Sequence, residues 1–264
     1  MQPRERIDRN SEEKDIKIPD LKALRERERR FREKGLPFEV FTIKTKTRWW
    51  NRVELQNVLS YLDPEGGEDV IDVGCSDGRF LGYLYGRFPG CRLFGIDFAR
   101  NSLKVLKNKG FRSHIVCGDI CEMPFKPGSF DHAVAVQVIQ QIPSREERIK
   151  VLRDINRMLR DGGTMVVTLL NQKAWYHLVK GGKEGPLITA EDLCVYLYDP
   201  ADIRREFEEA GFSVSRIAGI NNLPAGYLKR LGILGVWLDI FITRFFRSLS
   251  LEKGCYLIAL CKKK

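Results

Sequence analysis

The residues of this 264-residue chain best suited to chemistry are three carboxylates, each near the end of an apolar run. Asp72 and Asp77 lie in or beside the glycine turn of VIDVGCSDGRF (70–80), which follows a strand-like pattern. Asp97 ends the next such run, in RLFGIDF, 19 residues beyond Gly78. An acidic residue at about that spacing can accept both hydroxyls of a ribose. The spacing therefore predicts a nucleoside-like ligand over this loop.

The loop itself limits the kind of ligand. The dinucleotide fingerprint G-x-G-x-x-G requires glycine where this chain has Ser76 and Arg79, so the match is poor. Two carboxylates beside the loop would repel a pyrophosphate and favour a cationic ligand. Asp119, in VCGDI, could meet the exocyclic amine of an adenine. Together these residues favour S-adenosylmethionine, although a structural role stays open for Asp72 as a loop organiser and for Asp119 as a loop cap.

These residues must be positioned by alternating strands and helices. Apolar runs predict strands near 69–73, 92–96, 112–117, 130–136 and 163–169, with helices near 78–88, 101–109 and 144–160. Farther along, the pattern predicts a helix at 199–210, a strand at 212–220, a long apolar helix at 227–249 and a last strand at 254–264. Two helices, at 20–35 and 47–62, precede the first strand. The pair Gly162-Gly163 is expected to end the helix that begins at Ser144. Such alternation implies a mostly parallel sheet.

Four segments of the chain resemble the class I S-adenosylmethionine-dependent methyltransferases of the type-11 group, which includes ubiquinone and menaquinone biosynthesis enzymes. They are VIDVGCSDGRF, LFGIDFA, VCGDICEMPFKPGSFDHAVAVQVIQQI and LRDINRMLRDGGTMVVT. The resemblance implies an α/β, Rossmann-like, doubly wound fold. Its seven-stranded, mostly parallel sheet would have an antiparallel terminal strand and a helical N-terminal lid. We expect a charged N-terminal helical extension (1–47) and a methyltransferase domain (48–264) with a helical insertion (223–250).

The resemblance also implies roles for single residues. The cofactor-binding residues that it implies are Asp72, Gly74, Cys75, Ser76, Asp77, Gly78, Asp97, Phe98, Asp119, Ile120, Val136 and Gln137. The glycine loop would lie against the methionine moiety, Asp97 would bind the ribose and Phe98 would flank the adenine. Val136 and Gln137 would line the cofactor near the sulfonium. Two departures are Ser76, where glycine is commoner, and Gln141, where relatives often have histidine.

A catalytic base is not identified in the sequence. Methyl transfer mainly requires alignment of an acceptor with the S–CH₃ bond, and a base only where the acceptor must lose a proton. Tyr176, His177, Tyr196 and Tyr198 lie where the acceptor pocket usually forms in this fold, and we name them as candidate substrate-pocket residues. A purely structural role as packing aromatics stays open for them.

The kind of acceptor and partner stays open. A net charge of +10 favours anionic partners such as nucleic acid or a membrane surface, although many basic enzymes bind neither. In the stretch 227–249, Lys229, Arg230, Arg244 and Arg247 flank an apolar centre. This stretch is either an interfacial helix that admits a lipid-like acceptor or a helix buried against the sheet or a partner subunit. The oligomeric state stays open.

Three functions follow as hypotheses. The favoured one is an enzyme that methylates a small hydrophobic acceptor, lipid-like or quinone-like. The segment 133–163 also resembles tRNA wobble-uridine methyltransferases, so a nucleic-acid acceptor is the alternative. The third is a non-catalytic cofactor-binding subunit that activates a partner.

Cysteine use and hydropathy suggest a location. The seven cysteines include no C-x-x-C pair, which predicts a reducing compartment and no metal site. No apolar segment typical of a signal peptide begins the chain, and the longest near-apolar run, 232–242, is too short to span a bilayer. We therefore expect a cytoplasmic protein, with peripheral membrane contact through 227–249 as an open alternative.

Overall fold

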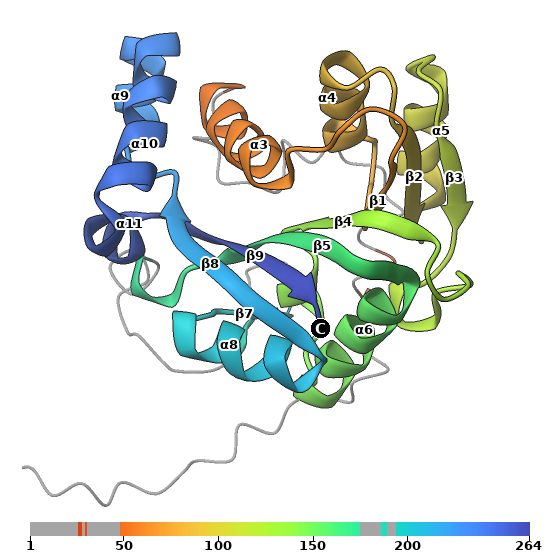
Figure 1. Cartoon of the computed structure of the whole chain (residues 1–264). Coiled ribbons are helices and arrows are strands. Elements are labelled where there is room, and N and C mark those ends of the chain that lie inside the picture. Colours follow the sequence, from red (N-terminus) through yellow and green to blue (C-terminus); the bar gives the residue numbers. More distant parts are fainter. Residues whose placement is uncertain (1–25, 28–29, 31–47, 175–185, 189–193) are drawn as a thin grey trace, which may run out of the picture.

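The computed structural model describes residues 26–27, 30, 48–174, 186–188 and 194–264 (Figure 1). Most of the predicted extension 1–47, including most of the predicted helix at 20–35, lies outside these ranges. The second predicted helix is present as α3 (Arg48–Leu62). From there the chain alternates between strands and helices, as the apolar pattern predicts.

The first five strands follow the predicted apolar runs closely. They are β1 (Asp69–Val73), β2 (Arg92–Asp97), β3 (His114–Cys117), β4 (Phe130–Val136) and β5 (Leu159–Leu170), followed near the C-terminus by β8 (Phe212–Ile220) and β9 (Tyr256–Lys263). The helices between them are α4 (Arg79–Arg87), α5 (Arg100–Asn108), α6 (Arg145–Met158) and α8 (Pro200–Glu209), with the 3-10 turns η1 (Ile120–Glu122) and η2 (Ile139–Gln141).

The seven main strands form one sheet in the order β3-β2-β1-β4-β5-β9-β8. Strands β1 to β5 are parallel to their neighbours among themselves, whereas β9 runs antiparallel to both β5 and β8. The predicted seven-stranded, mostly parallel sheet with an antiparallel terminal strand is therefore confirmed. The carboxyl ends of β1 to β5 and β8 meet at one edge of the sheet, which we call the carboxyl edge. The amino end of β9 lies at the same edge.

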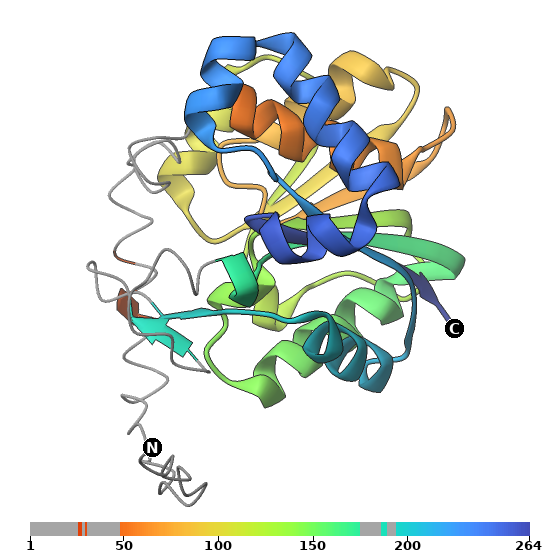
Figure 2. The same ribbon diagram turned by 90° about the vertical axis from the view of Figure 1, so that its left-hand side faces the viewer.

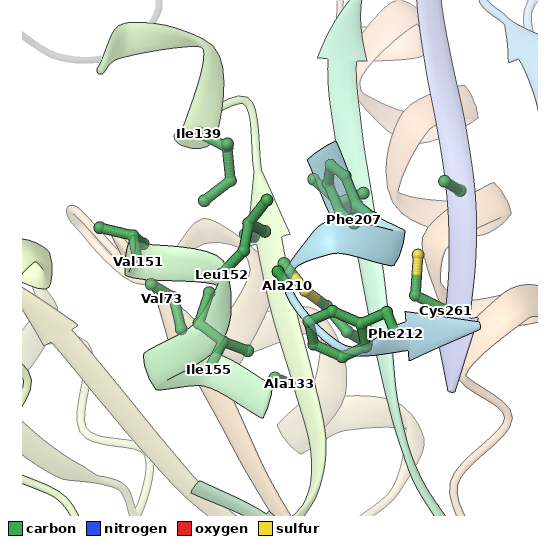
Figure 3. Packing of buried hydrophobic residues seen from close by; sticks show 14 of the residues in the cluster. Val73, Ala133, Ile139, Val151, Leu152, Ile155, Phe207, Ala210, Phe212 and Cys261 are labelled. Atoms are coloured by element: carbon green, nitrogen blue, oxygen red, sulfur yellow. The ribbon is translucent and has the colours of Figure 1, made fainter. Parts of the chain in front are cut away.

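Helices cover both faces of this sheet (Figure 1). Buried side chains of α3, α4 and α5 pack on one face, and those of α6 and α8 on the other. Figure 3 shows the second side, where α6 contributes Val151, Leu152 and Ile155, α8 contributes Phe207, and Ala210 follows at the end of α8. Burying each large apolar side chain of this kind contributes about 1.5–3 kcal/mol, so both layers hold the strand ends in place.

The expected end of the helix that begins after Ser144 is wrong. Helix α6 ends at Met158, before the glycine pair, and strand β5 already begins at Leu159. Gly162 has φ 75° inside this strand, and the β4–β5 register is irregular between Phe130 and His132. The pair therefore marks a strand irregularity rather than a helix stop, because glycine admits the positive φ that such a bend requires.

The long apolar stretch is three helices rather than one, namely α9 (Ala225–Leu231), α10 (Ile233–Phe245) and α11 (Arg247–Lys253). Gly232 separates the first two with φ 56° and ψ −126°, a conformation that side chains disfavour. A small antiparallel pair that the sequence did not indicate, β6 (Pro186–Ile188) with β7 (Cys194–Tyr196), lies between β5 and α8 along the chain.

Helices α9, α10 and α11 connect the carboxyl end of β8 to the amino end of β9, so they lie at the carboxyl edge. In Figure 2 they face the viewer in blue, outside α3, with which α9 and α10 are in contact. Helix α11 lies directly on β8, because a Cβ atom on Gly219 would be 1.7 Å from the carbonyl oxygen of Ser250. Among the described helices, none is long and apolar enough to cross a membrane.

Candidate active site

The predicted cofactor residues meet at the carboxyl edge of the sheet. The loop 74–78 follows β1, Asp97 ends β2, Asp119 follows β3 and Gln137 follows β4. These strands are neighbours in the order β3-β2-β1-β4. The chain connections change direction between β1 and β4, and open α/β sheets bind ligands at such a switch point. The four strand ends thus form one candidate site.

The glycine loop is held in a conformation that few side chains tolerate. Gly74, Ser76 and Gly78 have φ values of 78°, 47° and 76°. Ser76 therefore adopts the left-handed conformation that glycine would take more easily. A Cβ atom on Gly74 would lie 2.4 Å from Val138 Cγ2, and one on Gly78 would lie 2.1 Å from Leu106 Cδ1. The loop is thus packed closely against Val138, just after β4, and against α5, and its positive φ values favour glycine at both positions.

Asp97 anchors this loop to β2. Its side chain is buried, its Oδ2 accepts a hydrogen bond from Ser76 N at 2.9 Å, and its Oδ1 accepts one from Ala99 N at 2.8 Å. An ionised carboxylate has about four acceptor positions, so it can accept hydrogen bonds from several donors at once. Contact with the ribose stays a prediction.

The other predicted cofactor residues lie around the same edge. Asp119 is exposed and caps η1, because its Oδ1 accepts from Cys121 N at 2.8 Å. Capping uses one oxygen and leaves acceptor positions for an adenine amine. Asp77 Oδ2 lies 2.9 Å from Lys109 Nζ. Cys75 and Ile120 are buried, and Phe98 and Val136 are half-buried.

Asp72 lies beneath the loop, only 2% exposed. The pKa of Asp72 is raised to about 7, chiefly by burial and also by the charge of Asp97, and the Arg79 guanidinium opposes both effects. Several carboxyl groups thus interact at one place in a chain of net charge +10. A cationic ligand would relieve their repulsion, which fits the sulfonium and ammonium of S-adenosylmethionine.

We expect S-adenosylmethionine to bind more tightly as pH rises through 7, because only the ionised Asp72 attracts the cation. Binding should release protons near that pH, measurable by isothermal titration calorimetry in buffers of different ionisation enthalpy. For the unliganded protein the raised pKa of Asp72 has the opposite effect, because it makes the folded state less stable as pH rises. Its contribution to stability is full below about pH 4, the pKa of an unfolded aspartate, and is lost as pH rises to about 7.

Asp72→Asn should remove both effects in calorimetry and thermal melts. Asp131→Asn is the matched control, because Asp131 accepts from Asp69 N and Arg160 at the opposite edge of the sheet. Proton release that persists in Asp72→Asn would assign the titration to another group.

A carboxyl group not predicted from the sequence, that of Glu54 in α3, also reaches this edge and is fully buried. Its Oε1 accepts from Gln137 Nε2 at 2.5 Å and Thr168 Oγ1 at 3.1 Å, and its Oε2 accepts from Arg79 Nη2 at 3.3 Å. Gln137 has φ 57°, and its carbonyl accepts from Gln141 Nε2. Glu54 therefore ties α3 to the glycine loop and to the end of β4.

Tyr196 and Tyr198 belong to a buried cluster centred on Arg148, which is 2% exposed. The Arg148 guanidinium donates to both Glu206 oxygens, at 3.0 and 2.6 Å, and lies 4.0 Å from the centre of the Tyr196 ring. The Tyr198 hydroxyl donates to Glu206 at 2.8 Å, and that of Tyr196 donates to Asp202 at 3.2 Å. Burial, aided by Asp202, raises the pKa of Tyr196 to about 12, and burial also raises that of Tyr198.

These contacts explain why both tyrosines pack where they do, whereas their contact with an acceptor stays a prediction. Tyr176 and His177 lie outside the described residues. The described histidines lie at the opposite, amino edge. His132 Nδ1 is 2.6 Å from Thr164 Oγ1, and His114 begins β3 and stacks on Phe94.

Comparison with known proteins agrees with this geometry. Residues 71–167 match the family model of the type-11 methyltransferase domain. Over 101 residues the chain is 32% identical to the tRNA (carboxymethyluridine(34)-5-O)-methyltransferase of Xenopus tropicalis, covering 38% of this chain and 15% of the relative. It is 28% identical over 101 residues to the Saccharomyces cerevisiae enzyme of the same name, and the match covers 38% of this chain and 35% of that enzyme. The matched region is thus a minor part of either relative's length.

Solved structures share the fold over most of the chain. The 1,6-didemethyltoxoflavin-N1-methyltransferase of Burkholderia thailandensis, solved with S-adenosylhomocysteine, has a TM-score of 0.65 at 12% identity and covers 94% of this chain and 92% of that one. The family match covers the glycine loop and the ends of β1 to β4, where the carboxylates gather. The predicted resemblance to the class I S-adenosylmethionine-dependent methyltransferases of the type-11 group is therefore confirmed over residues 71–167, and S-adenosylmethionine is the cofactor that this domain implies.

Proposed function

We propose that the whole chain is an enzyme that transfers the methyl group of S-adenosylmethionine to a small hydrophobic acceptor, lipid-like or quinone-like. The observation that carries this proposal is the position and surface of α9, α10 and α11. They lie at the carboxyl edge, outside α3, and expose large apolar side chains such as Leu234 and Trp237. An apolar acceptor would meet favourable surface at the same edge of the sheet as the site.

Methyl transfer from the sulfonium is a single displacement at the methyl carbon. The acceptor's electron pair forms the new bond to the methyl carbon, the S–CH₃ bond breaks, and the sulfonium becomes the neutral thioether of S-adenosylhomocysteine. When the acceptor is an anion, its negative charge and the positive charge of the sulfonium both disappear, so a site without water favours the step. Neither described histidine lies at the carboxyl edge, so an acceptor that enters already ionised, or that loses its proton to water, suits the described residues best.

A tRNA acceptor is the second candidate, favoured by the similarity to the two tRNA methyltransferases above. That similarity covers 38% of this chain. The overall charge of +10 is compatible with RNA. The apolar surface of α10 is not a feature that RNA binding requires.

One labelling experiment separates these acceptors. Purified protein is incubated with methyl-labelled S-adenosylmethionine and a lysate of its source organism, and lipid extract, RNA and protein are then counted separately. We expect label in the lipid extract, absent with Asp97→Asn. Label in RNA that falls steeply with salt would replace the hydrophobic acceptor by tRNA. Label in none, despite bound cofactor, would overturn both and favour the non-catalytic activator subunit.

A further inference from the structure

Helix α10 presents its apolar side to solvent. Its exposed large apolar residues are Ile233, Leu234, Trp237, Leu238, Phe241 and Phe245, with Leu234 70% and Trp237 62% exposed. At about 100° per residue these six positions fall on one side of the helix. A surface helix of a globular protein normally turns that side toward the core.

The opposite side of α10 is buried and contains polar groups. Asp239 accepts from Asn222 Nδ2 at 3.0 Å, and Thr243 Oγ1 donates to the Gly219 carbonyl at 3.0 Å. Asp239 is fully buried and also accepts from the backbone N–H of Leu223 at 2.8 Å. Rolling α10 to bury its apolar side would leave these groups unpaired, which is costly. The hydrogen bonds therefore hold the apolar side outward.

Basic residues outnumber acidic ones on the exposed surface of α9, α10 and α11. The exposed charged residues of 225–253 are Lys229, Arg230, Arg244, Arg247, Glu252 and Lys253, five basic and one acidic. Arg244 lies on the same side of α10 as Trp237 and Phe241, by the helical period. We call this combined surface of α9, α10 and α11 the docking face.

We propose that the docking face binds the surface of an anionic lipid bilayer. Apolar side chains on an interfacial helix enter the boundary between headgroups and acyl chains, and basic side chains beside it are attracted by anionic lipid. The surface has both components in one place. The proposal goes beyond the acceptor, because it holds for whichever molecule is methylated.

A bilayer suits this face better than a second copy of the chain. In a two-fold dimer the same patch meets itself, so the arginines and lysines around α10 would approach their own copies. Like charges in such an interface oppose association. Anionic lipid phosphates would instead neutralise them.

The test is co-sedimentation of the full chain with vesicles, without added cofactor, so that its result does not depend on methyl transfer. We expect binding to vesicles of phosphatidylcholine with phosphatidylglycerol, and at least about tenfold weaker binding to phosphatidylcholine alone or at high salt. The double variant Trp237→Glu, Phe241→Glu should lose most of the binding, and Arg230→Glu, Arg244→Glu should lose the preference for anionic lipid. The matched control is Val105→Glu on α5, which is 50% exposed and remote in sequence from the docking face. It should bind as the unchanged protein does.

Three results would overturn the proposal. One is no binding to either vesicle, and another is equal binding by Trp237→Glu, Phe241→Glu and by Val105→Glu. The third is a dimer of the unchanged protein in sedimentation velocity that becomes monomeric in the variant Trp237→Glu, Phe241→Glu, together with no binding of the unchanged protein to vesicles. Retained binding of S-adenosylmethionine by each variant shows that the fold has survived. Lipid labelling without vesicle binding would leave the proposed function standing while this proposal fails.

Discussion

Asp97→Asn is expected to weaken the binding of S-adenosylmethionine about 100-fold. The carboxylate accepts hydrogen bonds from Ser76 N and Ala99 N at the end of β2, where the ribose is predicted to bind. An amide provides one oxygen and turns an N–H₂ group toward the remaining donors. Hydrogen bonds to charged groups contribute about 1.5–3 kcal/mol each, so the loss amounts to about 3 kcal/mol.

Isothermal titration calorimetry with S-adenosylmethionine and S-adenosylhomocysteine measures this loss. Both ligands have the ribose, so both should weaken similarly, which separates Asp97 from groups that respond to the sulfonium charge. Asp131→Asn is again the matched control, since it removes a carboxylate that accepts a backbone N–H at the amino edge. It should lower the melting temperature without changing cofactor affinity. Unchanged affinity in Asp97→Asn would restrict Asp97 to organising the loop.

The cofactor edge could be predicted from the sequence because its determinants are local. VIDVGCSDGRF contains a buried strand, a turn that requires positive φ at Gly74, and the start of a helix, all within 11 residues. Parallel strands bring their carboxyl ends together without further information. The spacing from Gly78 to Asp97 was therefore enough to place the two residues at one edge.

Features that depend on packing between distant segments could not be predicted from the sequence in this way. The stretch 227–249 is apolar nearly all round, so periodicity alone left a buried helix and an interfacial helix equally open. Which side of α10 faces the rest of the fold depends on Asp239 and its partner Asn222, which turn the polar side of this helix inward. Similarly, Gly162-Gly163 suits a helix stop as well as a bend in a strand, and pairing with β4 decides in favour of the bend.

Glu54 was missed although it left a signal. It stands between Val53 and Leu55 in α3, and both neighbours are buried. A charged residue among core positions is rarely buried unless it is paired, so it indicates a partner elsewhere in the chain. Which partner it meets depends on tertiary contacts with Gln137 and Thr168, 83 and 114 residues away. No local pattern contains that information.

Glu54→Ala is expected to lower the free energy of unfolding by about 3–5 kcal/mol, the cost of removing one member of a buried charged network. Three donors lose their acceptor at once, from Arg79, Gln137 and Thr168. Typical domains are stable by about 5–15 kcal/mol, so the variant should remain folded but marginal. Urea denaturation of the unliganded protein measures the change. Cofactor binding should weaken as well, because Gln137 and Arg79 flank the predicted position of the methionine moiety.

Two further variants separate this network from ordinary packing of α3. Gln56→Ala, on the same helix, should change the free energy of unfolding by less than about 1 kcal/mol. Thr168→Val removes one donor and leaves the carboxyl group its two others, so it should cost about 1 kcal/mol. If Glu54→Ala matched Gln56→Ala in denaturation and in cofactor affinity, the network would contribute nothing to either. If it lost cofactor affinity at unchanged stability, Glu54 would position the site without holding the fold, because a loosened Gln137 and Arg79 would then be the only consequence.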